Sequence, residues 1–281
     1  MPTPRAACIH DLSGLGKCSL TAAIPVLSAM GVQACPLPTA VLSNQTGFSS
    51  YAMADMTPHL DAFASEWQRR GVRFDGVYSG FLCSAQQAAF VGRLLDMLAG
   101  PDTLVLVDPV LGDDGAVYPV FDGAMCEAVG RLVRRADVIT PNLTEACLLD
   151  GGDYAALAAS ETLEPIWALA ERLCVLGPRL VVVTGVHRDG EIWNLGYDAR
   201  EGRRFSAATR RVGGGYSGTG DLLASVLCGG LLRGERPEQA LRRAAALLEA
   251  AVRETFAENG DPNEGVAFEH HLQLLQKERS V

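Results

Sequence analysis

Short apolar segments alternate with longer amphipathic segments along most of this sequence. The short segments lie near residues 5–9, 33–37, 75–79, 103–108, 137–140 and 180–184. The clearest two, TLVLVDP and RLVVVTG, are β-branched runs that end at proline or glycine, as strands buried on both faces do. Segments between them, such as SAQQAAFVGRLLDMLAG, carry apolar residues at helical spacing and end in glycine. The alternation predicts an α/β fold, with a mostly parallel central sheet and helices on both faces.

The pattern changes after residue 185. GEIWNLGYD and GRRFSAATRRV predict two paired edge strands, antiparallel and joined by a polar turn. Two long helices are predicted at about 219–233 and 237–257, and a short terminal helix over FEHHLQLLQKERSV. The sequence has no repeat, low-complexity tract or Pro/Ser-rich linker. We therefore expect a single domain over residues 1–281.

Charge and the N-terminal segment restrict the partners of the chain. A net charge of −9 over 281 residues argues against nucleic acid or an anionic membrane as the main partner. MPTPRAACIHDLSG lacks the apolar core of a signal peptide, and no apolar run approaches the roughly 20 residues that span a bilayer. The eight cysteines are scattered without a C-x-x-C motif, which is typical of a reducing compartment. We expect a cytoplasmic protein that binds small molecules.

The stretch RVGGGYSGTGDLLASVLCGGLL changes from a glycine loop to an apolar helix at one acid, Asp221. Glycines let successive N–H groups point into one hollow, and the start of a helix adds partial positive charge there. One interpretation makes Asp221 an ordinary helix N-cap. The other makes it the base that takes the proton of a substrate hydroxyl. In that case the amides of Gly218, Thr219 and Gly220 stabilise the phosphoryl group being transferred.

Two glycine-rich stretches match known nucleotide-binding motifs incompletely. GGGYSG fits G-x-G-x-x-G, but a dinucleotide fingerprint belongs in the first βα turn of a fold, and this one comes late in the chain. DLSGLGKCS resembles a P-loop, yet Cys18 stands where Ser or Thr is required and Asp11 where the first glycine is required. It is predicted to be a βα loop before a helix that begins near Lys17. An NAD(P)-binding oxidoreductase is therefore a weaker alternative.

Four further segments, together with GTGD, resemble the pyridoxal kinase branch of the ribokinase-like superfamily. They are VLSNQTGF (41–48), SGFLCSAQQ (79–87), VDPVLGDDGAVY (107–118) and ITPNLTEACLL (139–149). The resemblance covers nearly the whole chain. It implies a three-layer α/β/α sandwich and a homodimer. It also implies transfer of phosphate from ATP to the 5′-hydroxymethyl group of pyridoxal, pyridoxine or pyridoxamine, in the salvage of vitamin B6.

The resemblance also implies roles for individual residues. Asp221 matches the catalytic base, and Asn142 and Glu145 supply oxygen ligands suited to Mg²⁺. Asp108 and Asp113 would lie close to the metal and the phosphates, with Asp108 a second candidate metal ligand. Taken alone, Asp108 fits a strand end followed by a turn, and Glu145 fits a surface acid early in a helix. A monovalent cation such as K⁺ is a further candidate cofactor.

The remaining assignments divide between nucleotide and substrate. The candidate ATP-binding residues are Asp108, Asp113, Tyr118, Thr140, Asn142, Thr184 and Thr219. The candidate substrate-binding residues are Asp11, Ser13, Thr46, Phe81 and Asp221. Thr46 matches a threonine that contacts the pyridine ring, and Phe81 a ring-packing aromatic, although an aromatic after a strand fits the core equally well.

The first loop departs from the pyridoxal kinase pattern. Typical members have a Ser-His pair after the first strand, whereas this chain has His10-Asp11-Leu12-Ser13. The stretch DLSGLGK is closer to the SDPSGGAG style of hydroxymethylpyrimidine kinases. A hydroxymethylpyrimidine kinase of thiamine biosynthesis is therefore the main alternative. A kinase-like fold kept only for binding is a third.

Overall fold

The computed structural model describes residues 2–276, which build a nine-stranded sheet in the order β11-β10-β9-β8-β5-β4-β1-β2-β3. The strands of this sheet are β1 (Arg5–Ser13), β2 (Gln33–Leu42), β3 (Met53–Asp55), β4 (Gly76–Ser79), β5 (Leu104–Val107), β8 (Val138–Ile139), β9 (Leu180–Arg188), β10 (Glu191–Asp198) and β11 (Arg203–Arg210). Strands β2, β1, β4, β5, β8 and β9 pair in parallel. The outer strands β3, β10 and β11 pair antiparallel.

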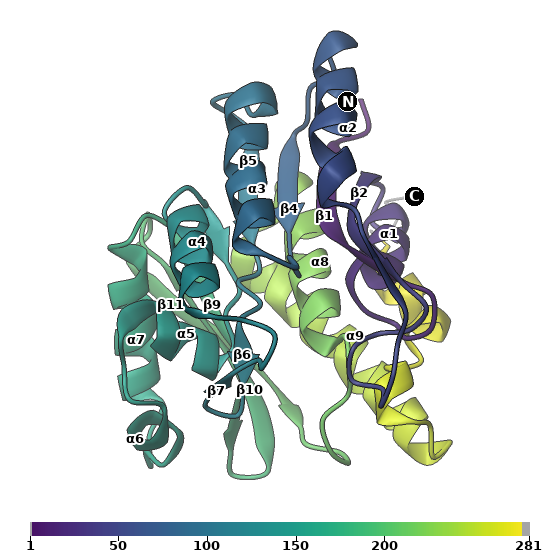
Figure 1. The fold of residues 1–281 in the computed structure, drawn as a ribbon. Helices are drawn as coiled ribbons and strands as arrows, with labels where there is room; N and C mark the ends of the chain where they lie inside the picture. The colour runs from purple at the N-terminus through teal and green to yellow at the C-terminus, as the bar shows by residue number, and fades with distance from the viewer. Residues whose placement is uncertain (1, 277–281) are drawn as a thin grey trace, which may run out of the picture.

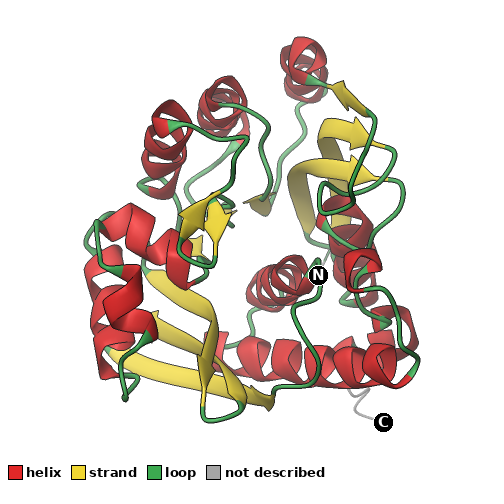
Figure 2. Cartoon of the chain, turned by 60° about the horizontal axis from the view of Figure 1, so that its bottom comes forward, coloured by secondary structure: helices red, strands yellow, loops and turns green. Residues whose placement is uncertain are grey.

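Helices cover both faces of the sheet (Figures 1 and 2). One face packs against α1 (Ser19–Ala29), α8 (Thr219–Leu232), α9 (Pro237–Ala257) and the 3₁₀ segment η2 (Phe268–Leu275). The other packs against α2 (Thr57–Arg69), α3 (Ala85–Leu98), α4 (Gly123–Val133), α5 (Leu143–Asp150), α6 (Tyr154–Ala158) and α7 (Glu164–Cys174). The predicted three-layer α/β/α fold is confirmed.

Strand sequence explains why both faces are covered. In β5, Val105 and Val107 belong to one hydrophobic core, while Leu104 and Leu106 belong to the core on the opposite face. Because successive side chains of a strand point to opposite faces, a continuous apolar run needs a helical layer on each side. The same holds for RLVVVTG, which forms β9.

Several boundaries differ from the sequence-based expectation. β2 and β9 continue five and four residues further than predicted, to Leu42 and Arg188. The first helix begins at Ser19 instead of Lys17. The predicted terminal helix is a 3₁₀ segment that ends at Leu275, and the part of that prediction at 277–281 lies outside the described residues.

Three short strands were not predicted. They are β3 and the hairpin strands β6 (Gly112–Asp113) and β7 (Ala116–Val117). Two- and three-residue strands carry too few side chains to show a periodicity. Tertiary contacts form them instead.

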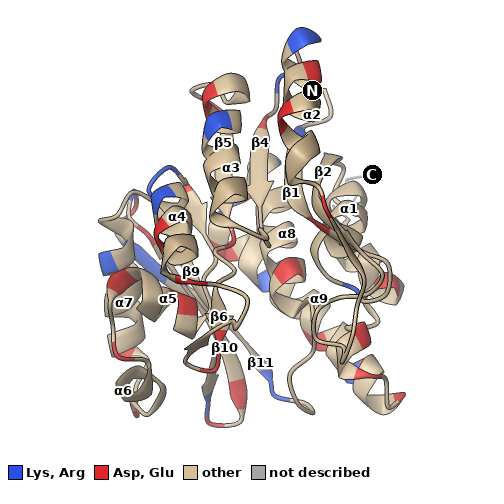
Figure 3. Cartoon of the chain, viewed as in Figure 1, with Lys and Arg blue, Asp and Glu red and all other residues tan. Residues whose placement is uncertain are grey.

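Charged residues of both signs lie on the outer helices α2, α3 and α4 (Figure 3). On α2, for example, Glu66 pairs with Arg70 at 2.7 Å and with Arg69 at 2.7 Å. Such exposed pairs each contribute only about 0–1 kcal/mol to stability. Within residues 2–276, no helix has the length and apolarity needed to cross a membrane.

Candidate active site

Acids from distant parts of the sequence meet at one edge of the sheet. Asp11 lies near the end of β1, Asp108 directly follows β5, and Asp221 lies in the first turn of α8. Their proximity is visible in their electrostatics, since the charges of Asp108 and Asp11 both raise the pKa of Asp221. The carboxyl ends of parallel strands share one edge of a sheet, and ligands bind there in open α/β folds.

The glycine loop places Asp221 inside the helix and not at its cap. Gly218 is the N-cap residue with φ of 78°, so Asp221 is the third helical residue. Among the described residues, no side chain caps the start of α8, which leaves its first N–H groups without side-chain partners. The N-cap interpretation of Asp221 is therefore wrong. The Tyr78 hydroxyl donates to the Asp221 carbonyl at 3.3 Å and helps fix this turn.

Asp221 has a much higher proton affinity than an exposed carboxylate. Its side chain is largely but not completely buried. Burial, then the charges of Asp108 and Asp11, raise the pKa of its carboxyl to about 8, against a backbone hydrogen bond from Ser19 that acts in the opposite direction. A desolvated carboxylate holds a proton far more strongly than one in water, which suits proton abstraction from an alcohol.

Asp108 and Glu145 form a second buried acid group. Burial raises the pKa of Asp108 to about 7, although its Oδ1 accepts a hydrogen bond from Thr140 Oγ1 at 2.9 Å. Glu145 is 4% exposed, and its carboxylate accepts the N–H groups of Leu111 at 3.1 Å and Asn142 at 2.8 Å. Burial and the Asp108 charge raise its pKa well above the ordinary value. The surface position that the sequence allowed for Glu145 is wrong.

The acids Asp108 and Glu145 fit an open Mg²⁺ site better than a closed site in which the protein supplies every ligand. Within residues 2–276, no three His, Cys, Asp or Glu side chains are arranged to hold a metal ion together. Mg²⁺ usually keeps several waters and binds through one or two carboxylates plus substrate phosphates. Asp108 and Glu145, two neighbouring desolvated acids, match that requirement because a cation would relieve the repulsion that raises the pKa of Glu145.

The predicted nucleotide residues lie around these acids. Burial first, and then the charges of Glu145, Asp113, Asp108 and Asp221, raise the pKa of Tyr118. The β6–β7 hairpin before Tyr118 is fixed to α5, because the Asn142 side chain donates to the Gly112 carbonyl at 2.8 Å.

Thr184 on β9 extends this group. It forms an isolated parallel bridge with Asn142, and its N–H donates to the Pro141 carbonyl at 2.9 Å. Thr219 closes the glycine loop, since its hydroxyl donates to the Tyr216 carbonyl at 3.2 Å. Most of the predicted ATP-binding residues thus lie around Asp108 and Glu145, while Thr219 begins α8, two residues before Asp221.

The predicted substrate residues are brought together less completely. Ser13 donates to Asp11 Oδ2 at 2.8 Å, and burial raises the pKa of Asp11 against this bond. Phe81 lies after β4 with its ring 5.8 Å from that of Phe121. Thr46 is exposed on the loop between β2 and β3. Its neighbour Gln45 donates a hydrogen bond to Ser217 Oγ at 3.1 Å, in the glycine loop before α8.

Sequence reasoning missed several residues that shape this region. Phe121 joins Phe81 to Tyr118, whose ring lies 6.3 Å from that of Phe121. Thr39 donates to the Phe81 carbonyl at 3.1 Å. No motif links residues so far apart in sequence. A close approach explains one glycine, since a Cβ at Gly80 would lie 2.2 Å from the ring of buried His10.

A parallel sheet with a desolvated acid behind a glycine loop at a helix start defines a ribokinase-like kinase. The chain belongs to the phosphomethylpyrimidine kinase family, whose model matches residues 16–264. It is 30% identical to the pyridoxine/pyridoxal/pyridoxamine kinase of Bordetella avium, over 82% of this chain and 78% of that protein. It is 30% identical to the pyridoxal kinase PdxY of Deinococcus radiodurans, over 87% of this chain and 84% of that protein.

Solved structures agree with these relatives. The pyridoxal kinase of Lactobacillus plantarum is 34% identical with a TM-score of 0.87, covering 98% of this chain and 97% of that one. A putative phosphomethylpyrimidine kinase of Bacteroides thetaiotaomicron, crystallised with pyridoxal, is 37% identical with a TM-score of 0.92, covering 97% and 96%. The predicted membership of the ribokinase-like superfamily is confirmed, and the oxidoreductase alternative is set aside.

Proposed function

We propose that this protein is an ATP-dependent pyridoxal kinase, which phosphorylates the 5′-hydroxymethyl group of pyridoxal, pyridoxine or pyridoxamine. The observation that carries the proposal is Asp221, an acid with a pKa raised to about 8 at the uncapped start of α8. Relatives named as pyridoxal kinases, and the pyridoxal in a 37% identical neighbour, favour a B6 vitamer over hydroxymethylpyrimidine.

In this proposal Asp221 accepts the proton of the substrate hydroxyl as that oxygen attacks the γ-phosphorus of ATP, and the bond to the bridging oxygen breaks so that ADP leaves. The backbone amides of Gly218, Thr219 and Gly220 point from the positive end of α8 and stabilise the negative charge on the transferred group. Space supports this assignment, because an added Cβ at Gly220 would meet no described atom within 4 Å.

Asp108 and Glu145 would hold Mg²⁺ in this proposal. When bound, Mg²⁺ neutralises the charge of the ATP phosphates. The protein contributes orientation: Thr140 holds Asp108, and the N–H groups of Leu111 and Asn142 hold Glu145. The bonds from Thr140 and Leu111 are buried and the bond from Asn142 is partly buried, so the protein itself orients both carboxylates.

The remaining predicted residues divide around the reacting groups. We assign Asp113, Tyr118, Asn142 and Thr184 to the nucleotide side, because they surround Asp108 and Glu145. We assign the substrate side to the residues on the β1, β2 and β4 loops. These are Asp11, Ser13, Thr46 and Phe81.

A coupled assay of ATP consumption with the three vitamers and hydroxymethylpyrimidine tests this function. We expect turnover of at least one vitamer, with kcat/KM at least about tenfold above that for hydroxymethylpyrimidine. The alternative retains one supporting observation, the hydroxymethylpyrimidine-kinase style of DLSGLGK. Preference for hydroxymethylpyrimidine, together with phosphorylation of its monophosphate, would establish that alternative and refute ours.

We further propose a homodimer in the cytoplasm and activation by a monovalent cation such as K⁺, which replacement of K⁺ in the assay would test. The exposed β2–β3 edge of the sheet supports the dimer, because Val41 on β2 is 40% exposed and Met53 on β3 is 48% exposed. All eight cysteines are free, as expected in a reducing compartment. Light scattering after size-exclusion chromatography would test the dimer, which a monomeric mass would contradict.

A further inference from the structure

Three loops that carry the proposed site meet at one short turn near the C-terminus. The turn is the 3₁₀ segment η1 (Pro262–Glu264), capped by the Asp261 side chain, which accepts the N–H of Asn263 at 2.9 Å. Its three successive carbonyl groups each accept a hydrogen bond from a different loop. The donors are Ser217 N to Pro262 at 3.0 Å, Gln45 Nε2 to Asn263 at 3.0 Å and Lys17 N to Glu264 at 3.0 Å.

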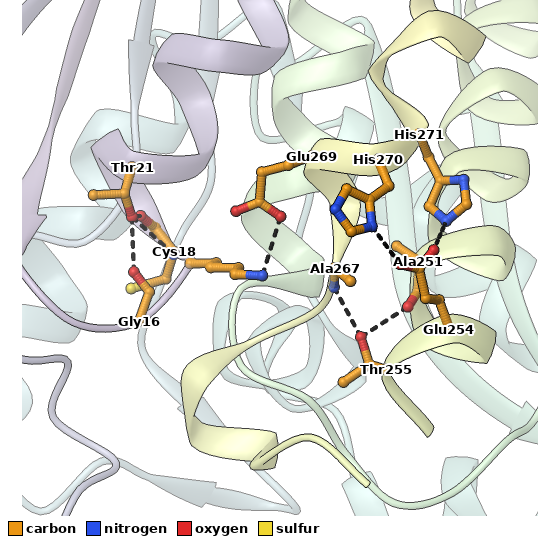
Figure 4. A network of polar contacts seen from close by, with 11 residues as sticks. Gly16, Cys18, Thr21, Ala251, Glu254, Thr255, Ala267, Glu269, His270 and His271 are labelled. Carbon is orange, nitrogen blue, oxygen red and sulfur yellow. Dashed lines mark hydrogen bonds and ion pairs between the residues drawn. The ribbon is translucent and has the colours of Figure 1, made fainter. Parts of the chain in front are cut away.

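The segment after this turn is itself firmly attached. Lys17 Nζ forms an ion pair with Glu269 at 3.0 Å, and Thr255 on α9 accepts the N–H of Ala267 at 2.8 Å (Figure 4). Gly265 has φ of 87°, and a Cβ there would lie 2.9 Å from Cβ of Lys17. The turn is therefore a fixed point against which the three loops are held.

Gln45 makes the most contacts at this junction. The residue is 9% exposed. Oε1 accepts the N–H of Gly47 at 2.6 Å, and Nε2 donates to both Ser217 Oγ at 3.1 Å and the Asn263 carbonyl at 3.0 Å. The fit is close, since a Cβ at Gly16 would lie 2.8 Å from Cγ of Gln45.

The hydrogen bond between Gln45 and Ser217 joins two segments that carry proposed site residues. Gln45 directly precedes Thr46, and Ser217 directly precedes Gly218. One buried amide therefore connects the loop assigned to the substrate ring with the loop assigned to the transferred phosphate. Its two donor hydrogens and one acceptor oxygen are all used, so it holds both loops in a single arrangement.

We infer that Gln45 is a positioning residue that couples the substrate loop 43–50 to the glycine loop 212–218. The inference rests on the proposed function for what the two loops bind, but the coupling itself is a property of the ligand-free protein. The side-chain partners of Gln45 are all protein groups, namely Ser217, Asn263 and Gly47. Gln45 acts by holding the backbone next to Thr46 and Gly218. A small displacement of these two residues would misplace the reacting groups, which lowers the rate strongly.

A double-mutant cycle tests the coupling. Gln45→Met removes both donor bonds and the bond accepted from the Gly47 N–H, and we expect kcat/KM for the vitamer to fall about 10- to 100-fold. Ser217→Ala removes one of the same bonds and should cost about threefold to tenfold. The double variant should be no worse than Gln45→Met alone, since the second bond is already lost. Multiplication of the two losses would overturn the inference.

The matched control is Gln33→Met, the same replacement at an exposed glutamine near the opposite end of β2. It should leave kcat/KM within twofold of wild type. If Gln45→Met fails to fold, Gln45→Glu takes its place, because it keeps an acceptor for the Gly47 N–H and loses the donor.

Hydrogen–deuterium exchange of the ligand-free proteins separates this inference from the proposed function. Gln45→Met should speed amide exchange in both 43–50 and 212–218 by at least about fivefold, while Gln33→Met changes neither. Faster exchange in 43–50 alone would contradict the coupling. A wild-type protein that phosphorylates no vitamer would refute the proposed function, and the exchange result would still decide the role of Gln45.

Discussion

The acids of the site differ from the surface acids in what surrounds them. Exposed Glu66 lies beside two arginines that hold its pKa below the ordinary value. For Asp221 and Glu145, burial is the main cause of a raised pKa, and nearby carboxylates raise it further. Buried acids that lie close together lower the stability of the folded protein. Bound ligands stabilise the folded state and can offset this loss, but the ligand-free protein has no such compensation.

Asp221→Asn should therefore stabilise the ligand-free protein. The folded pKa of about 8 lies above the ordinary value of 3.8, so the folded state holds this proton more tightly than the unfolded state. The stability that this provides is complete below pH 4 and is lost as pH rises through 8. The advantage of Asp221→Asn should grow over this interval to about 2 kcal/mol, discounted for partial exposure of the side chain.

Urea denaturation of both proteins in EDTA at pH 5, 7 and 9 measures this difference. The two proteins share every titrating group except residue 221. The difference between their stabilities at each pH therefore reports on Asp221. A stability difference that is constant with pH, or that favours the wild-type protein at pH 9, would contradict the desolvated state of Asp221.

Asp108→Asn tests the metal assignment. The variant keeps an oxygen that accepts the Thr140 hydroxyl, but it removes one negative charge beside Glu145. We expect about tenfold more Mg²⁺ to be needed for half-maximal activity, because a neutral amide is a weaker Mg²⁺ ligand than a carboxylate. A titration of rate against free Mg²⁺ gives the value. An unchanged Mg²⁺ requirement would remove Asp108 from the metal site.

At the scale of elements, the start of α8 depends on one backbone conformation. Gly218 has φ of 78°, and a Cβ there would lie 1.9 Å from the Lys17 carbonyl oxygen. Gly218→Ala should thus move the glycine loop away from the β1–α1 loop and lower kcat at least about tenfold, with a loss of about 1–3 kcal/mol in stability. Steady-state kinetics and thermal melting report the two effects.

Gly214→Ala is the matched control for that substitution. Gly214 has no positive φ, and a Cβ there would meet no described atom within 4 Å. Its activity should stay within about twofold of wild type. Equal effects of the two alanine substitutions would mean that general flexibility of the loop, and not the conformation at 218, controls the rate.

Elements with strong periodicity could be predicted from sequence, and elements formed by tertiary contact could not. TLVLVDP and RLVVVTG show β5 and β9 through their unbroken apolar runs. The exposed strand β3 has no buried residue to reveal it. Within the site, Asp221 and Asp108 are marked by local motifs. Gln45 is not, because its partner Ser217 lies 172 residues away.

At the scale of the whole molecule, the sheet brings the site together from both ends of the chain. β1, from the N-terminal segment, lies between β2 and β4 in the sheet. The C-terminal turn at 262–264 accepts bonds from the loop after β1, the loop after β2 and the glycine loop. This turn links the loop after β1 to the glycine loop, and the charge of Asp11 contributes to the raised pKa of Asp221. Burial of those acids against each other is the physical basis of the proposed chemistry.

The central claim is that Asp221 removes the proton from a vitamer hydroxyl during phosphoryl transfer. Its most direct test is the kcat of Asp221→Asn with pyridoxal and saturating MgATP, alongside calorimetric binding of pyridoxal to the same variant. We predict that kcat falls by about 10²–10⁴ while pyridoxal still binds within about fivefold of wild type. A kcat within about threefold of wild type would contradict the account.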